Sequence, residues 1–186
     1  KMDPAWKDKN YGEVVLIYQQ GWGPRKFPNP EFTSLPKLYP TSNFTKKAKL
    51  VVEHGKKPIE EETQRILSVQ DVAIKTLNDQ YAGLIAKRVA GMAAKAVVAD
   101  QIRQKQGVLG DLAYIGMTLA DRADLRQWSM LPESFQVAKL FLPAGEYKMK
   151  VVGLTGENGA TGEEMDFGTV KVQPRKKTFL AWRSFK

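Results

Sequence analysis

The chain has 186 residues, of which 42% are apolar and 26% are charged, and it fits a globular domain with a sizeable core. It contains no cysteine, which excludes disulfides, thiolate catalysis and Cys-based zinc or iron–sulfur sites. The net charge of +9 is uneven, because residues 59–126 are neutral whereas both ends are basic. Such a surface favours anionic partners, including acidic proteins, lipids or glycans. It does not favour specific nucleic-acid binding, since a DNA-reading helix would concentrate the charge on itself.

Short β-strands are predicted before residue 58. The apolar run at 14–18 is typical of a buried strand, and 49–53 is a second candidate. The segment between them carries prolines at 28, 30, 36 and 40, so it is expected to be extended, with one edge strand near 35–39.

The connection after the first strand begins with Trp22, Arg25 and Lys26, which together form a candidate partner-binding loop. An aromatic side chain beside basic residues could stack on a sugar or a base. The simpler interpretation is that Trp22 closes the end of a β-core.

The middle of the chain predicts helices. Pro58 followed by three glutamates at 60–62 is expected to start a first helix, because proline fits the first turn and carboxylates complement the helix dipole. Those glutamates point about 100° apart on a helix, so they do not converge on a metal ion. A longer helix is expected over 69–106, a stretch without proline that is rich in alanine.

Two stripes run along the longer helix. Large residues recur at 74, 77, 81, 84 and 85, and small residues recur four apart at Ala82, Ala86, Ala90 and Ala94. The small-residue row would let another backbone approach closely, so these alanines are candidate partner-binding residues. Lys87, Arg88 and Lys95 interrupt the apolar segment and argue against a transmembrane span.

A helix of this length must bend or protrude, because it would span ~55 Å whereas a compact chain of this size has a diameter of roughly 40 Å. A turn at 106–110 and a second helix over about 112–119 predict an αα-hairpin. From Ser134 the apolar pattern alternates, and four strands are expected as a β-meander, with 147–152 pairing back on 135–142. Glycines at 153, 156, 159 and 162 predict a hairpin loop, or alternatively an ion-gripping loop that uses nearby carboxylates.

Catalytic signatures are sparse in the sequence. His54 is the only histidine and lies on a predicted turn, and no Gly-x-Ser-x-Gly elbow, nucleotide loop or zinc signature is present. We therefore assign no catalytic, metal-binding or cofactor-binding residue, and the assignment leans away from an enzyme.

The order of features from about 84 to 151 resembles a known family. The segments that carry the resemblance are the Ala-rich helix, residues 120–128 (Ala-Asp-Arg-Ala-Asp-Leu-Arg-Gln-Trp), Leu131-Pro132, 135–140, 142–147 and the early Gly-Trp-Gly-Pro-Arg-Lys at 21–26. They are similar to the C-terminal domain of a poorly characterised family of bacterial cell-envelope lipoproteins with upstream tetratricopeptide-like repeats. The resemblance implies a periplasmic location at the outer membrane, through an upstream lipidated segment outside this chain.

The predicted fold is α+β: a single domain, 1–186, built as an antiparallel β-sandwich of about seven strands with an inserted long helical hairpin. Its parts are 1–58 (strands and Pro-rich loop), 59–126 (hairpin) and 127–186 (meander). The function expected from sequence is a non-enzymatic envelope binding or scaffold module. Its partner would be an envelope protein or a second copy bound through the long helix. The alternatives are a carbohydrate-binding or carbohydrate-processing β-sandwich and nonspecific binding to anionic surfaces.

Overall fold

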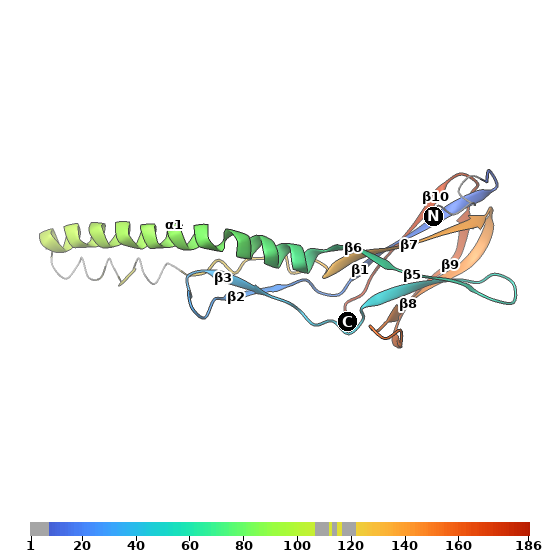
Figure 1. The fold of residues 1–186 in the computed structure, drawn as a ribbon, viewed down its shortest axis with the longest axis horizontal. Coiled ribbons are helices and arrows are strands. Elements are labelled where there is room, and N and C mark those ends of the chain that lie inside the picture. The colour runs from blue at the N-terminus through green and yellow to red at the C-terminus, as the bar shows by residue number, and fades with distance from the viewer. Residues whose placement is uncertain (1–7, 107–111, 113–114, 117–121) are drawn as a thin grey trace. The chain divides into compact units, whose positions relative to one another are not determined.

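The computed structural model describes residues 8–106, 112, 115, 116 and 122–186. It is a mixed α+β structure, and its described residues form ten strands and one long helix (Figure 1). The chain divides into two compact units. The sheet unit comprises residues 1–23, 41–70 and 129–186, and the helical unit comprises 24–40 and 71–128.

The first sheet of the sheet unit has four strands in the order β10 (Lys177–Arg183), β1 (Tyr11–Gln20), β7 (Ser134–Pro143), β6 (Gln64–Ser68). Figure 1 shows β1 between β10 and β7, and strand pairing is parallel on the β10 side and antiparallel on the β7 side. The register places Leu16 opposite both Leu180 and Ala138. The expected strand at 14–18 is thus confirmed, and it is central to its sheet.

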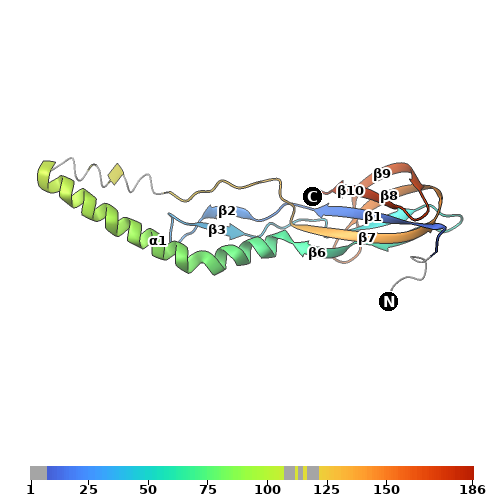
Figure 2. The ribbon, with the colours of Figure 1, turned by 90° about the horizontal axis from the view of Figure 1, so that it is seen from above.

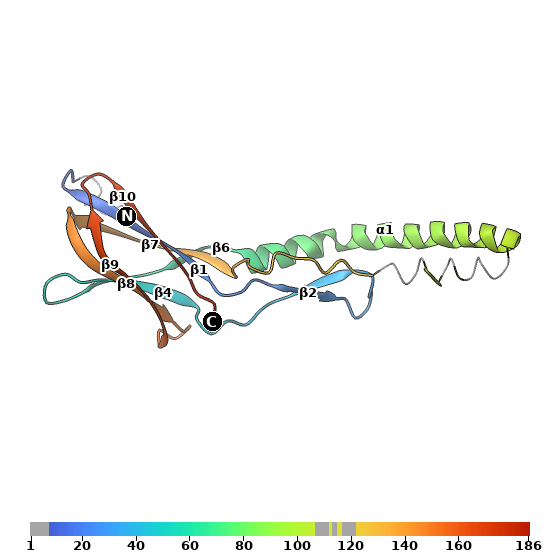
Figure 3. The same cartoon turned by 180° about the vertical axis from the view of Figure 1, so that it is seen from behind.

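The second sheet also has four strands, in the order β5 (Ile59–Glu62), β4 (Lys47–Val52), β8 (Gly145–Leu154), β9 (Ala160–Val172). All of its pairs are antiparallel, and Figure 3 shows β4, β8 and β9 side by side. The predicted loop at 153–162 connects β8 to β9 as a hairpin, and Asn158 within it has a positive φ of 69°. The carboxylates around that loop do not converge on one point, because Glu163 accepts a hydrogen bond from the Ser184 hydroxyl whereas Glu164 pairs with Lys150.

The two sheets share one hydrophobic core. It takes alternate residues from both sheets, as period-two side-chain alternation requires: Val14, Leu16, Tyr18, Ala138, Leu142, Leu180 and Trp182 from the first, and Ala48, Leu50, Val52, Tyr147, Met149, Val151 and Val172 from the second. The rings of Tyr18 and Trp182 lie 5.2 Å apart between their centroids. Each fully buried aliphatic side chain here stabilises the fold by about 1.5–3 kcal/mol.

The predicted C-terminal meander is wrong in its pairing. β7 pairs with β1 and β6, whereas β8 pairs with β4 and β9, so 147–152 does not fold back on 135–142. The turn at 143–145 instead carries the chain from one sheet to the other, and β10 crosses back to pair in parallel with β1. Both faces of β7 carry apolar side chains, so sequence alternation alone could not show which neighbour each face meets.

The predicted helix start at Pro58 is also wrong, because residues 59–68 form β5 and β6. The glutamates form ion pairs with lysines of β4. Glu60 and Glu62 lie opposite β4, and their carboxylates pair with Lys49 at 2.8 Å and Lys47 at 2.5 Å. Cross-strand ion pairs of this kind, together with core packing by Ile59, outweigh the local helical preference.

Thr63 stands at the corner between β5 and β6, where the chain changes sheets. Its hydroxyl accepts a hydrogen bond from the Ala48 amide at 2.9 Å and donates one to Gln136 Oε1 at 2.7 Å. Because Ala48 belongs to the second sheet and Gln136 to the first, one buried hydroxyl links the two sheets.

The helical unit contains helix α1 (Val69–Gln106) and the hairpin of β2 (Arg25–Pro28) with β3 (Pro36–Tyr39) (Figure 2). The expected edge strand near 35–39 is confirmed as β3. Asn29, which follows β2 and is 4% exposed, hydrogen-bonds the hydroxyl of Tyr81 on α1. The hairpin is thereby tied to the helix.

Helix α1 matches the sequence prediction at both ends and is one continuous element of 38 residues, about 57 Å long. Gly83 and Gly91 both lie within the continuous helix. The second half of the predicted αα-hairpin lies largely outside the described residues. Among those described, 112, 115 and 116 are helical, and 122–128 is irregular.

Candidate binding surfaces

Trp22 closes one end of the sheet unit. Its indole N–H donates to the carbonyl of Phe185 at 2.8 Å, and the two rings pack with centroids 5.2 Å apart. The guanidinium of Arg183 lies 5.8 Å from the Trp22 ring and 5.0 Å from the Phe185 ring, and it donates to the Gly21 carbonyl at 3.1 Å. Burial lowers the pKa of Arg183. The indole is thus engaged by the C-terminal segment of the sheet unit, through its N–H and through ring packing.

A buried polar network supports this end. The side chain of Gln20, which is 2% exposed, donates to the Thr45 carbonyl at 3.0 Å and to Glu133 Oε2 at 2.8 Å, and it accepts from the Ser134 hydroxyl at 2.8 Å. Asn43 donates to the same Glu133 oxygen at 2.6 Å. The network fixes the segment that carries Trp22 through satisfied hydrogen bonds, so it is a structural arrangement and not a reactive one.

Arg25 and Lys26 belong to the helical unit, whereas Trp22 belongs to the sheet unit. The Lys26 amide donates to Gln127 Oε1 at 2.6 Å, and its ammonium donates to the Arg126 carbonyl at 3.0 Å. Lys26 therefore fastens β2 to residues 126 and 127. These interactions assign Lys26 a structural role within its own unit.

An exposed ion pair lies beside that attachment. Asp124 and Arg126 form two side-chain hydrogen bonds, at 2.8 and 3.0 Å. The hydrogen-bonded Arg126 guanidinium holds the pKa of Asp124 well below its usual range. Trp128, two residues after this pair, is 72% exposed.

Helix α1 presents two different faces. The predicted large-residue stripe is half-buried, as expected: it consists of Ile74, Leu77, Tyr81, Leu84 and Ile85. The predicted small-residue row at Ala82, Ala86, Ala90 and Ala94 is exposed. A side chain added at Gly83 would meet no atom within 4 Å.

The exposed face follows a heptad pattern that we call the α1 seam. Its spacing alternates four and three residues, and its members are Lys75, Asp79, Ala82, Ala86, Val89, Ala93, Ala96 and Asp100. All eight are exposed, and Val89 is 54% exposed. The seam is apolar along its centre, with Lys75 and Asp79 at one end and Asp100 at the other.

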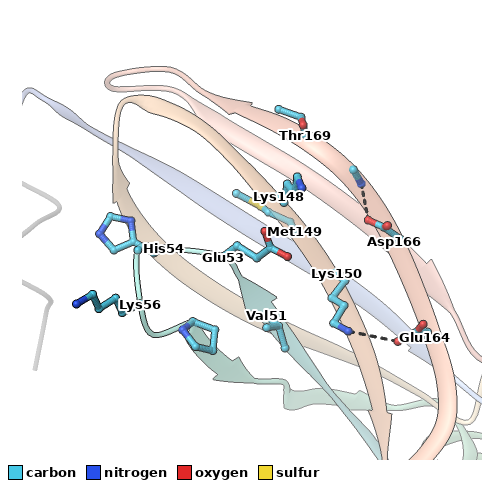
Figure 4. Close-up of a pocket in the computed structure, with 13 residues that line it drawn as sticks. Val51, Glu53, His54, Lys56, Lys148, Met149, Lys150, Glu164, Asp166 and Thr169 are labelled. Atoms are coloured by element: carbon cyan, nitrogen blue, oxygen red, sulfur yellow. Dashed lines mark hydrogen bonds and ion pairs between the residues drawn. The ribbon is translucent and has the colours of Figure 1, made fainter.

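A groove of about 610 Å³ opens on the outer face of the second sheet (Figure 4). The side chains of Lys148 and Lys150 come from β8, Glu164 and Asp166 come from β9, and His54 lies in the turn after β4. A register shift after Met149 and a positive φ of 64° at Gly168 mark an irregularity in the β8–β9 pair where the groove lies. The groove is therefore lined by side chains of both charges.

Part of this charge is already used within the groove. Lys150 pairs with Glu164 at 3.6 Å, and Asp166 accepts the Gly168 amide at 2.7 Å. His54 packs beside Tyr147, with ring centroids 5.9 Å apart. Among the described residues, no group of three or more His, Asp or Glu side chains is placed to hold a metal ion. The groove can bind a polar ligand through mixed charges and hydrogen bonds.

Comparison of the chain with protein-family models, curated proteins and solved structures finds no match. Within the described part of the chain, no helix combines the length and apolar character that a membrane crossing requires. The inference of function therefore rests on the surfaces themselves.

The sequence predicted the helix and a row of alanines four apart on it, and the exposed positions also include a heptad pattern. The alanines four apart drift around the helix, whereas the heptad spacing stays on one face. That spacing was visible in the sequence. The groove had no sequence signal, because its residues come from three separate segments that only strand pairing brings together.

Proposed function

We propose that this chain is a non-enzymatic protein-binding module that self-associates through the α1 seam. The observation that supports it is the exposure of all eight seam positions on a helix whose opposite face is half-buried. An apolar face in a heptad pattern is typical of helices that pair with another helix. A location in the bacterial cell envelope, attached through a lipidated segment upstream, extends this proposal from the sequence resemblance alone.

The charges at the seam ends favour an antiparallel pair of copies. If two seams pair antiparallel about the midpoint between residues 87 and 88, Lys75 of one copy lies opposite Asp100 of the other. The same alignment places Ala82 opposite Ala93 and Ala86 opposite Val89. Small residues at the contact let the helices approach closely, and the end charges attract instead of repelling. Asp100 also accepts a hydrogen bond from Gln104 at 2.9 Å on its own helix, and an exposed carboxylate has further acceptor sites for a partner lysine.

Oligomeric state tests this proposal. Sedimentation velocity of the wild-type chain should show a concentration-dependent dimer, and Ala86→Glu should weaken dimerisation by at least roughly tenfold because it places charge in the centre of the seam. Ala94→Glu is the matched control, since it makes the same change at an exposed position a quarter turn away on the same helix. A wild-type chain that remains monomeric, or equal effects of the two variants, would exclude the seam as the interface.

A charge exchange tests the direction of pairing. Lys75→Glu alone should weaken an antiparallel dimer, and adding Asp100→Lys should restore it, because the two opposite charges have changed places. In a parallel dimer each position meets its own copy, so like charges face each other in every variant and Lys75→Glu alone would not weaken the dimer. Circular dichroism of each variant would show whether the helix is retained.

The groove supports a second candidate function, carbohydrate binding. Its mixture of lysine, carboxylate and histidine side chains can donate to and accept from sugar hydroxyls. A glycan array with wild type and Lys148→Ala would test it, and Trp22→Ala would separate the groove from the sequence-based expectation of a Trp22 platform. Binding that Lys148→Ala leaves unchanged would exclude the groove.

A further inference from the structure

The outer face of the first sheet is apolar, although it points away from the core. Val14, Leu16 and Tyr18 of β1 lie in the core, so the residues between them point outward. The register joins the outward side chains into rows that cross the sheet: Phe179, Val15 and Lys139 in one row, Ala181, Ile17 and Val137 in the next, and Phe135 with Leu67 beyond them. We call the apolar members of these rows the outer apolar face.

The edges of this face are well exposed. Phe179 on β10 is 62% exposed and Leu67 on β6 is 46% exposed, whereas Val15 in the middle is only 9% exposed. The side chains at the centre thus cover one another, and those at the rim leave apolar surface accessible. The register also places Gln64 opposite Val137 and Gln19 opposite Phe135, so the apolar members run diagonally from Phe179 on β10 to Leu67 on β6. Such an apolar patch is unusual on a surface without a partner.

The charged groups around the face are mainly basic. Glu13 is the one carboxylate among the residues of β10, β1, β7 and β6, and its side chain is 13% exposed and pairs with Lys139 and Lys177 at 2.8 and 3.5 Å. The two lysines remain 51% and 60% exposed, so they can engage a further anion. Because Glu13 is shielded and both lysines remain accessible, the edge of the outer apolar face near them is positively charged. A second copy would bring the same positive rim, and the like charges would oppose that pairing.

The width of the outer apolar face indicates which kind of partner element fits on it. Four strands spaced about 4.8 Å apart give a strip of roughly 14 Å, which matches the 10–12 Å diameter of one helix. We propose that the outer apolar face binds an amphipathic helix of another protein, with the apolar stripe of that helix against Phe179, Ile17 and Leu67 and its acidic residues toward Lys139 and Lys177. This inference is independent of the α1 seam, because every residue in it belongs to the sheet unit.

Two synthetic amphipathic peptides with the same leucine stripe serve as probes, one with a glutamate-rich polar face and one with a lysine-rich polar face. Fluorescence anisotropy should show at least roughly tenfold tighter binding of the acidic peptide to the full chain, with an affinity that falls as salt is added. The measurements use the Ala86→Glu variant, in which pairing through the α1 seam is weakened. Peptide binding then reports on the outer apolar face whether or not the seam proposal holds.

Phe179→Asp should abolish binding of the acidic peptide. Phe44→Asp is the matched control, because Phe44 is 63% exposed against 62% for Phe179 and lies in the sheet unit outside the first sheet. Lys177→Gln should weaken the acidic peptide several-fold and reduce the salt dependence, with Phe179 intact. Equal binding of both peptides, no binding of either, or equal loss in the two phenylalanine variants would overturn the proposal.

Discussion

Replacement of Gln20 by leucine removes three hydrogen bonds of 3.0 Å or less at the end of the sheet unit where Trp22 is held, together with a longer one of 3.5 Å from Gln136. The side chain is 2% exposed, and it bonds a backbone carbonyl, a serine hydroxyl and the carboxylate of Glu133. The two neutral bonds contribute about 1 kcal/mol each and the charged one about 1.5–3 kcal/mol. Leucine recovers roughly 1 kcal/mol by burying apolar surface in the same place. We therefore expect Gln20→Leu to lower the free energy of unfolding by about 3 kcal/mol.

Urea unfolding followed by tryptophan fluorescence measures this change, since Trp182 lies in the core near the network. Gln19→Leu is the control, because Gln19 is the next residue on β1 and its side chain points to the outer face. It should change the free energy of unfolding by less than ~0.5 kcal/mol. A loss below ~1 kcal/mol for Gln20→Leu would refute the view that the network stabilises this end. A similar loss in both variants would refute the assignment of the loss to the hydrogen bonds.

Three further predictions concern the fold. Gly12→Ala should destabilise the sheet unit by ~2 kcal/mol or more, because the new Cβ would lie 2.3 Å from a backbone carbonyl oxygen. Gly83→Ala, in open space on α1, should instead stabilise the protein by about 0.5–1 kcal/mol. Thermal unfolding measures both changes, and the same sign for both would contradict the packing argument. Thr63→Val should cost about 2 kcal/mol in urea unfolding because it breaks the hydroxyl link between the sheets, and a change below ~0.5 kcal/mol would show that the link contributes little. Burial raises the pKa of Tyr18, so the tyrosine ionises first in the unfolded state, and the free energy of unfolding should fall as the pH rises above about 10. Tyr18→Phe should flatten that fall. An unchanged pH profile in the variant would assign the loss of stability to other groups.

In the β region, the local sequence predicts where strands form, whereas the tertiary structure decides which strands pair. The strands at 14–18 and 49–53 were predictable, because short β-branched runs bounded by turns favour extended backbone in any context. Their partners were not predictable. The sequence order of β7 and β8 suggested a hairpin, yet Val137 pairs across to Ile17 and Val151 pairs across to Leu50. Pairing depends on the total core that two sheets bury together, and no local window contains that information.

In the acidic segment at 60–62, the local sequence also fails to predict the secondary structure. Three adjacent glutamates after a proline favour a helix start when each residue is considered alone. In the folded chain the carboxylates of Glu60 and Glu62 on the edge strand β5 form ion pairs with Lys49 and Lys47 of the neighbouring strand β4. Tertiary contact overrode a weak local preference, as it commonly does for short segments.

The sequence by itself determined the long helix from 69 to 106, the absence of cysteine chemistry and the basic charge of both ends, because helix propensity and composition are local properties. The tertiary structure alone decided the parallel pairing of β10 with β1, the groove beside Lys148, and the outward exposure of Phe179. Each of these depends on residues far apart in the chain. The α1 seam lies between the two cases: its heptad spacing is written in the sequence, but only the packing of the opposite face shows that the seam is left open to a partner.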